Sequence, residues 1–384
     1  MNNSLAQNNI VDIKSDGIIF PFAIEIDPME KLLLVNFEKD PDSVYMGFEP
    51  QVFDDPINGT GHLIIGWRTD KKIDVYHQKS LKPDTSKYSI AGAGLNKMIP
   101  VDMEKAFYEV NDFGVQAHYK FRDMLEREVE ISIRENNQRK RKPFGLLAPM
   151  GDAATHPTAL PMVLLHDFYF VRKNETDIQV SINDKYHQLE NLPIRMDRQK
   201  MTFVRYSPKP LIATFNPEFN GVLYDFRPSV GQETFQMGDY VYDIEWTDHT
   251  AFIKSMSVKN NIHMLTMSFS PSFPCLTTIP ANTRFMGEFT ITGHESVGSI
   301  SGAYTIESSK ESMHISLVPS KGWKPKTTKF STWFLFSVAK VFKKWPTTYQ
   351  WNAELHKSPE GLWYMQSKWM RTGKILKDPT HLKH

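Results

Sequence analysis

The residues best placed for acid–base chemistry are His166 and Asp167, which interrupt an apolar segment at 160–170. Adjacent residues of a strand point to opposite faces, so these two side chains need separate partners. A buried carboxylate must either accept hydrogen bonds or carry a raised pKa, and a raised pKa suits a proton donor. We therefore predict that Asp167 and His166 are catalytic, and that Phe168 and Phe170 contact a ligand. Alternatively, both polar residues are satisfied core residues that fix the strand register.

A second acidic group lies in the segment 239–249. As a strand, this segment sends Asp243 and Glu245 to one face, about 7 Å apart. Two carboxyl groups at that spacing can act as proton donor and acceptor, as they do in sugar-processing enzymes. A solvated face of an antiparallel sheet gives the same pattern without chemistry. The same segment supplies further predicted site residues: His249 as a catalytic group, and Tyr242 and Trp246 as ligand contacts.

The stretch 322–351 combines many aromatic residues with lysines and contains no acid. A helix over 330–345 would carry aromatic residues on one side and lysines on the other, as helices in a lipid headgroup layer do. The competing interpretation is a helix that covers the end of a barrel, with Phe330 and Phe334 packed inward. The lipid interpretation predicts membrane contact through Trp333, Phe336, Lys340, Lys343 and Lys344.

Composition limits the partners of this 384-residue chain. Its 45 basic and 44 acidic residues nearly cancel, which argues against a nucleic-acid partner. Cys275 is the single cysteine, so we expect neither a disulfide framework nor a multi-cysteine zinc site. The histidines form no HExxH motif, and no dinucleotide or phosphate-binding glycine motif occurs. We therefore predict no metal site and no cofactor, while metal dependence and the oligomeric state stay open.

The first twenty residues are too polar for a signal peptide, and no apolar run is long enough to cross a bilayer. We therefore expect a cytoplasmic protein that contacts the inner face of a membrane peripherally. The basic run Arg139-Lys140-Arg141-Lys142 is interpreted as a solvated loop, with a nucleic-acid patch as its alternative.

Short segments rich in β-branched and aromatic residues, separated by turn formers such as Asn58-Gly59, predict an all-β fold. Both faces of segment 162–171 are apolar, which predicts a central strand. The expected strands cover residues 18–26, 32–37, 62–67, 114–121, 126–133, 162–171, 178–182, 201–206, 211–215, 240–246, 251–258, 263–269, 285–292, 298–306 and 313–318.

A break in the strand pattern at 219–232 suggests two domains, at 1–220 and 221–384, with the basic aromatic helix in the second. We expect two antiparallel β-barrel, lipocalin-like halves with one amphipathic helix near 330–345. The alternative architecture is a single large β-supersandwich.

The density of strands, the aromatic segments 166–170 and 240–246, and the closing segment 363–369 resemble tandem lipocalin-like proteins related to hydroxyneurosporene synthase, the carotenoid hydratases. The likeness is one of architecture, because no catalytic motif matches residue by residue. It implies a long apolar cavity and acid-catalysed hydration or cyclisation of an isoprenoid double bond. In that mechanism a buried carboxylic acid donates the proton, a role that would fall to Asp167 with His166 or His249 in support.

These patterns favour a protein that binds, and as a lyase converts, an apolar small molecule drawn from a membrane surface, either an isoprenoid or an acyl lipid. Two alternatives remain open at this point. One is a lipid-binding protein without catalytic activity, and the other is a carbohydrate-active β-supersandwich enzyme.

Overall fold

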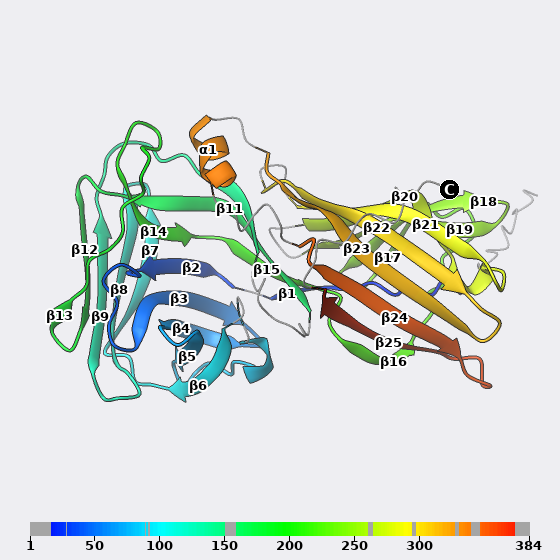
Figure 1. The fold of residues 1–384 in the computed structure, drawn as a ribbon, viewed down its shortest axis with the longest axis horizontal. Coiled ribbons are helices and arrows are strands. Elements are labelled where there is room, and N and C mark those ends of the chain that lie inside the picture. Colours follow the sequence, from blue (N-terminus) through cyan, green and yellow to red (C-terminus); the bar gives the residue numbers. More distant parts are fainter. Residues whose placement is uncertain are drawn as a thin grey trace, which may run out of the picture.

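The computed structural model describes residues 17–27, 29–88, 90, 93–149, 159–259, 264–293, 297–326, 330–338 and 346–372. The predicted all-β class is confirmed, since strands dominate and every expected strand overlaps an observed one (Figure 1). The helices among these described residues are two short 3-10 helices, η1 (Thr85–Lys87) and η2 (Leu276–Thr278), and one α-helix, α1 (Phe330–Val338). The expectation of a helix to residue 345 continues beyond the described residues.

The first sheet has ten strands, and β11 lies in its interior between β14 and β15, with β10 also paired to it. The prediction that 162–171 is a central strand is therefore confirmed. The strands of this sheet are β1 (Ile24–Asp27), β2 (Lys31–Asn36), β3 (Tyr45–Asp55), β4 (Gly59–Arg68), β5 (Lys72–His77), β6 (Gly94–Pro100), β10 (Phe144–Pro149), β11 (Leu160–Arg172), β14 (Met201–Ser207) and β15 (Pro210–Phe215).

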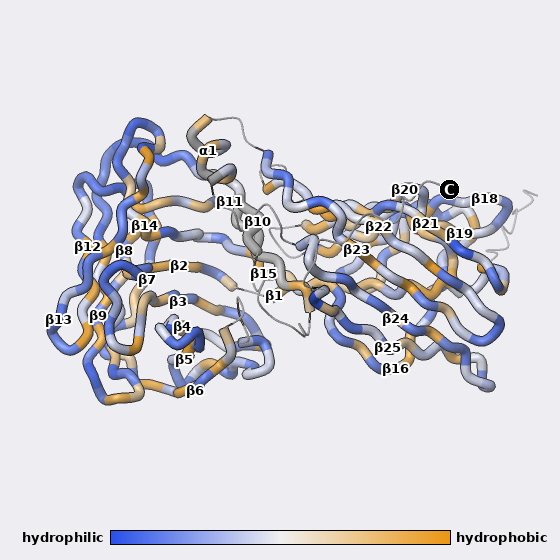
Figure 2. The backbone as a smooth tube through the Cα atoms, viewed as in Figure 1, coloured by the Kyte–Doolittle hydropathy of each residue, from blue (hydrophilic) through white to orange (hydrophobic). Residues whose placement is uncertain are grey.

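A second sheet of five strands packs across one face of the first sheet (Figure 1). Alternation along β2 sends Leu33 and Val35 into this interface, where they join Tyr119 and Ile131 of the second sheet in one buried cluster. Figure 2 shows the hydrophobic stretches along the strands, with polar residues concentrated in many of the outer turns. The second sheet contains β7 (Lys105–Asn111), β8 (Gly114–Arg122), β9 (Glu128–Glu135), β12 (Thr176–Ile182) and β13 (Lys185–Tyr186).

The third sheet has ten strands, and β17 to β25 follow one another as an antiparallel meander, with β16 added beside β25. Consecutive strands pair wherever a short turn joins them, because short connections favour antiparallel neighbours. The strands are β16 (Phe219–Leu223), β17 (Thr234–Met237), β18 (Tyr240–Thr247), β19 (Thr250–Lys259), β20 (Met264–Pro274), β21 (Arg284–Thr292), β22 (Ser299–Ser308), β23 (Ser312–Lys324), β24 (Tyr349–Lys357) and β25 (Trp363–Arg371).

The architecture is sandwich-like, and among the described strands none of the sheets closes into a barrel. Each sheet runs from one edge strand to another, so the barrel form expected for the two halves is corrected to open, curled sheets. Strands before Phe215 belong to the first two sheets and strands after Phe219 belong to the third. The division into domains at 1–220 and 221–384 stays a prediction.

The N-terminal segment joins the two regions, because residues 17–22 run from β1 into the third sheet (Figure 1). Ile18 forms a backbone bridge with Phe226. The ring of Phe20 contacts Tyr242 of β18 at a centroid distance of 5.5 Å, and the ring of Phe22 contacts Trp351 of β24 at 5.4 Å. One short segment therefore touches strands near both edges of the third sheet, which shows that the sheet curls around it.

Replacing Phe22 by alanine should lower the free energy of unfolding by about 3–5 kcal/mol, because the truncation leaves a cavity at the centre of this core. Urea denaturation measures the loss. Phe113 is 44% exposed, so Phe113→Ala serves as the control and should change the stability by about 0.5 kcal/mol or less. Equal losses in the two variants would contradict the central position of the N-terminal segment.

Candidate functional site

The buried carboxylates of the described residues differ in how they are neutralised. Glu49 has no arginine in direct contact within the described structure, and its partners are uncharged donors. An unpaired buried carboxylate is costly in its charged form, so it marks a candidate site more clearly than a paired one. The other buried acids form ion pairs at 2.6–2.8 Å: Asp74 with Arg68, Asp123 with Arg127, and Glu135 with Arg172.

Glu49 is only 4% exposed. The side-chain amide of Gln51 donates to its Oε1 at 2.9 Å, and the indole of Trp67 donates to its Oε2 at 3.1 Å. Burial raises the pKa of Glu49 to about 6, although these two hydrogen bonds and the charge of Arg205 act in the opposite direction. The carboxyl group can therefore hold or release a proton close to neutral pH.

Strand alternation in β3 determines the face of the first sheet to which Glu49 points. Phe48 belongs to the cluster between the first and second sheets, so Glu49 and Gln51 point to the opposite face of the first sheet. Phe53 continues on that opposite face and belongs to the larger core. The carboxyl group is thus surrounded by an apolar core rather than by water.

Arg205 of β14 is the cation whose charge lowers the pKa of Glu49. It lies with its guanidinium carbon 4.3 Å from the ring centroid of Phe203 and donates from Nη2 to Oδ1 of Asn36. Its Nε is buried and has no hydrogen-bond partner in the described structure. Burial lowers the pKa of Arg205 to about 10, so the side chain remains charged at neutral pH.

Glu49 and Arg205 lie two strands apart, because β2 separates β3 from β14 and Leu34 of β2 pairs with Arg205. Two strand spacings put the backbones of β3 and β14 about 10 Å apart. Side chains between and beside the two charges keep partial exposure, so this face is not sealed. We call it the Glu49 face and define it by Leu34, Asn36, Glu49, Gln51, Trp67, Phe203 and Arg205. It combines a titratable carboxyl group, a fixed cation and two aromatic rings.

The structure separates the predicted site residues of β11. Phe168 and Phe170 are buried in the larger core, and the ring of Phe170 lies 6.1 Å from that of Phe203, next to the Glu49 face. Asp167 is half-buried on the other side of the strand with Tyr169, whose pKa is raised by burial and by the charge of Asp167. His166 belongs to β11, but its side chain lies outside the described part of the structure.

The predicted site residues of β18 lie in the third sheet, away from those of β11. Asp243 and Glu245 share an exposed face, as the strand pattern predicted, and each accepts a hydrogen bond of 2.6 Å from a serine hydroxyl. His249 is exposed in the turn after β18. This arrangement matches the solvated-face alternative and does not bring the carboxylates to a histidine or an arginine among the described contacts.

The two aromatic residues of β18 that were predicted as ligand contacts, Tyr242 and Trp246, both contact other parts of the protein. Tyr242 is buried and its ring stacks on Phe226 at 4.6 Å. Trp246 is half-buried and donates from its indole nitrogen to the carbonyl oxygen of Gln232 at 2.9 Å. The structure gives both residues core or turn contacts rather than a place on the Glu49 face.

The side of helix α1 that packs against the protein differs from the side that the sequence predicted. Phe336, predicted as a lipid contact, is buried against Trp323 at a centroid distance of 4.8 Å. Phe330 and Phe334, which the barrel-end interpretation packed inward, are 77% and 40% exposed, and Trp333 is 54% exposed. The reason is that β23, which carries Trp323, supplies the packing surface. The predicted contacts Lys340, Lys343 and Lys344 lie outside the described residues.

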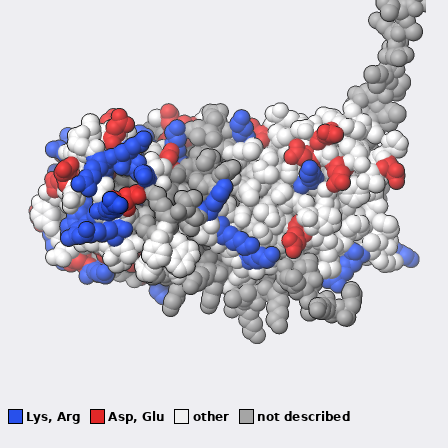
Figure 3. Space-filling model, turned by 90° about the horizontal axis from the view of Figure 1, so that it is seen from above, with Lys and Arg blue, Asp and Glu red and all other residues white. Residues whose placement is uncertain are grey.

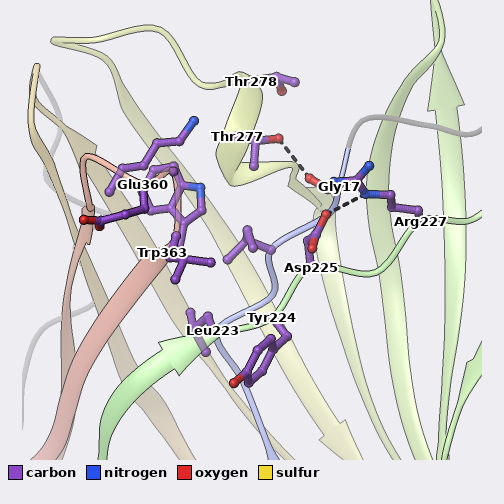
Figure 4. Close-up of a pocket in the computed structure, with 13 residues that line it drawn as sticks. Gly17, Leu223, Tyr224, Asp225, Arg227, Thr277, Thr278, Glu360 and Trp363 are labelled. Carbon is purple, nitrogen blue, oxygen red and sulfur yellow. Dashed lines mark hydrogen bonds and ion pairs between the residues drawn. The ribbon is translucent and has the colours of Figure 1, made fainter.

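A groove of about 390 Å³ lies at one end of the third sheet (Figure 4). Arg227 donates to Asp225 at 2.7 Å, and the hydroxyl of Thr277 donates to the carbonyl oxygen of Gly17 at 3.2 Å. Trp363 and Lys357 also line the groove. A Cβ atom at Gly17 would lie 1.9 Å from Asp225 Oδ2, so only glycine allows this close approach.

Comparison with known proteins leaves the function to be argued from the site. No family profile, no curated protein and no solved structure matches the chain. Within the described residues, no helix has the length and apolar character needed to cross a membrane. The same residues contain no group of three histidine, cysteine or acidic side chains arranged to hold a metal ion.

Glu49 and Arg205 are the residues that the sequence analysis missed. Gly47 and Pro50 weaken the strand signal of β3. Glu49 and Gln51 share one face of that strand, and two polar residues on one face predict a solvated surface. The available signal was the apolar content of Phe48, Val52 and Phe53 around the acid. It indicates a strand, but it does not indicate that the second face is covered.

Glu49→Gln should gain stability relative to the wild type as the pH rises. The pKa of about 6 lies above the reference value of 4.5, so the folded state binds this proton more tightly than the unfolded state. The resulting stabilisation is complete below pH 4.5 and is lost as the pH rises through 6. The variant cannot ionise, so its stability relative to wild type should rise by about 2 kcal/mol between pH 4 and pH 7.5.

Urea unfolding at several pH values measures this difference. The control is Glu109→Gln, because Glu109 is exposed, and its stability relative to wild type should change little with pH. A difference that is independent of pH in both variants would contradict the raised pKa of Glu49.

Proposed function

We propose that the protein binds an apolar small molecule, an isoprenoid or an acyl lipid, on the Glu49 face and converts it by acid catalysis. The observation that carries the proposal is a buried carboxyl group that has only uncharged hydrogen-bond donors among the described residues and lies beside apolar side chains. Burial raises the pKa of this group to about 6. Glu49 replaces Asp167 as the proposed proton donor, because Asp167 lies on the opposite side of β11 from Phe168 and Phe170.

The surroundings of Glu49 support protonation of a carbon–carbon double bond. The acid transfers its proton to one alkene carbon, and a carbocation forms at the other carbon. The ring of Trp67 stabilises a nearby cation through its negative face. Arg205, whose guanidinium already lies over the ring of Phe203, favours the carboxylate that remains. Water then adds to the carbocation and its excess proton returns to the carboxylate, which restores Glu49. Loss of a neighbouring proton to the carboxylate instead of water addition gives isomerisation. Attack of a second double bond of the same substrate on the carbocation, followed by loss of a proton to the carboxylate, gives cyclisation.

Glu49→Gln should reduce turnover about hundredfold or more, because a general acid contributes that much and glutamine cannot donate a proton to an alkene. The assay incubates the protein with geranylgeraniol or squalene in isotopically labelled water and follows incorporation of the label by mass spectrometry. The wild-type rate should increase as the pH falls from 7 towards 6 and level off below it.

Asp167→Asn is the matched control and should keep the wild-type rate. Loss of activity in Asp167→Asn with full activity in Glu49→Gln would reverse the assignment of the donor. If neither alkene is converted but both bind with affinities that Leu34→Arg abolishes, the protein is a carrier, which is the non-catalytic alternative. If neither binds, the proposal for the Glu49 face is wrong.

The groove at Trp363 favours a second candidate function, the binding of a carbohydrate. Its lining combines the rings of Trp363 and the 82% exposed Tyr224 with the charged side chains of Arg227 and Lys357. Aromatic rings beside a few polar groups are suited to the faces and hydroxyl groups of sugars. This site would replace Asp243 and Glu245 as the place of carbohydrate recognition.

Trp363→Ala should weaken binding of an oligosaccharide such as cellohexaose about threefold to tenfold, through loss of one aromatic contact. Isothermal titration calorimetry measures the affinity. Trp333→Ala, which changes an exposed tryptophan outside the groove, is the control. Absence of heat with a panel of neutral and acidic oligosaccharides would exclude carbohydrate binding in the groove.

A further inference from the structure

The loops next to the end of β11 form a strongly basic surface. Segments 138–142, 173–175 and 197–200 contain only two acids, Glu175 and Asp197. Figure 3 shows lysine and arginine side chains gathered at one end of the face seen from above. Apart from the half-buried Arg141, the cations are exposed. We define the basic surface by Arg139, Lys140, Arg141, Lys142, Lys173, Arg198 and Lys200.

Hydrogen bonds hold these segments together. Arg172 donates from Nη1 to the carbonyl oxygen of Arg139, and the backbone nitrogen of Lys173 donates to the carbonyl oxygen of Lys200 at 2.9 Å. The side-chain amide of Asn137 donates to Gln199 at 3.3 Å. The basic run is thus a solvated loop, as its sequence suggests, and hydrogen bonds hold its backbone beside two other loops.

Arg141 fixes the middle of the run. Its guanidinium carbon lies 4.9 Å from the ring centroid of Tyr169, and it donates hydrogen bonds to the hydroxyl of Tyr206 and the carbonyl oxygen of Asn111. With Arg141 held inward, the neighbouring Lys140 and Lys142 remain exposed. The contacts of Arg141 therefore hold the part of the backbone from which these two lysines project, which lowers the entropic cost of binding an anionic surface.

Helix α1 lies on the same side of the molecule, above β11 in Figure 1. Its exposed rings contact one another: Phe330 lies 5.7 Å from Trp333 and 6.4 Å from Phe334 between ring centroids. Phe336 on the opposite side of the helix is packed against Trp323, which anchors α1 to the third sheet. The helix thus presents a small aromatic surface while its other side is fixed.

We propose that this side of the protein docks on an anionic lipid bilayer, with the rings of Phe330, Trp333 and Phe334 in the headgroup layer and the basic surface on the lipid phosphates. Aromatic side chains and cations on one side of a protein are the combination that peripheral membrane binding requires. The chain has a net charge of only +1, so the attraction is local and directional. A nucleic acid would bind the cations but would not need the exposed helix.

Flotation with vesicles tests the docking surface in the full-length protein. Wild type should bind vesicles of phosphatidylcholine with phosphatidylserine, bind pure phosphatidylcholine poorly, and lose binding in high salt. Lys140→Glu with Lys142→Glu should weaken binding about thirtyfold or more, since each cation near the surface contributes and each new acid is repelled. The control changes two exposed lysines of the third sheet, Lys254→Glu with Lys368→Glu, and should bind as wild type does.

A second pair of substitutions tests the exposed aromatic rings of α1. Phe330→Ser with Trp333→Ser should weaken vesicle binding while salt sensitivity remains. Tyr224→Ser with Leu362→Ser, which changes two exposed residues beside strands of the third sheet, should have little effect. Wild type that fails to float, or equal binding by both lysine pairs, would overturn the proposal. Binding of an RNA oligonucleotide that is unaffected by the loss of the Phe330 and Trp333 rings, with no flotation, would instead identify a nucleic-acid surface. Glu49→Gln should float normally, so failure of docking and failure of the proposed reaction are distinguishable.

Discussion

The packing of the N-terminal segment inside the curled third sheet is the constraint on which the rest of the structure depends. An open sheet of ten strands needs apolar cover on its inner face, and Phe20 and Phe22 supply it from a part of the chain that precedes β1. The C-terminal region adds a reciprocal contact, because the indole of Trp369 donates to the carbonyl oxygens of Phe215 and Asn216 at 3.0 Å. The regions on either side of residue 219 therefore share one core, although the sequence pattern predicts two domains.

Given that shared core, both faces of the first sheet carry buried clusters, and the polar groups within them must find partners inside the protein. Asp74 shows the usual solution: it accepts hydrogen bonds from Arg68, Asn96 and the hydroxyl of Tyr45, which satisfy its oxygen atoms inside the protein. Glu49 has neutral donors and a cation two strands away instead. The same burial thus produces rigid ion pairs in one place and a group that titrates near neutral pH in another. This difference in partners, rather than burial alone, distinguishes a candidate site from structural polar residues.

The proposed ligand site and the proposed docking surface use related physical properties. An apolar ligand has low solubility in water, so a protein that presents aromatic rings and cations to a membrane can collect such a ligand where it is concentrated. β11 links the two features: Phe170 lies beside Phe203 of the Glu49 face, and Arg172 at the end of the same strand holds the basic surface through the carbonyl oxygen of Arg139. The two proposals nevertheless stand on separate residues.

The sequence by itself determined the all-β class, the positions of most strands and the central place of segment 162–171, because alternation and β-branched or aromatic content are local properties. It also correctly placed Asp243 and Glu245 on one face. Only the tertiary structure decided which faces are covered. Glu49 reads as solvent-facing until the core covers it, Phe336 is buried because Trp323 lies opposite, and Phe20 and Phe22 fill a sheet formed hundreds of residues later. Burial depends on contacts between distant segments, and a strand pattern records only which residues share a face.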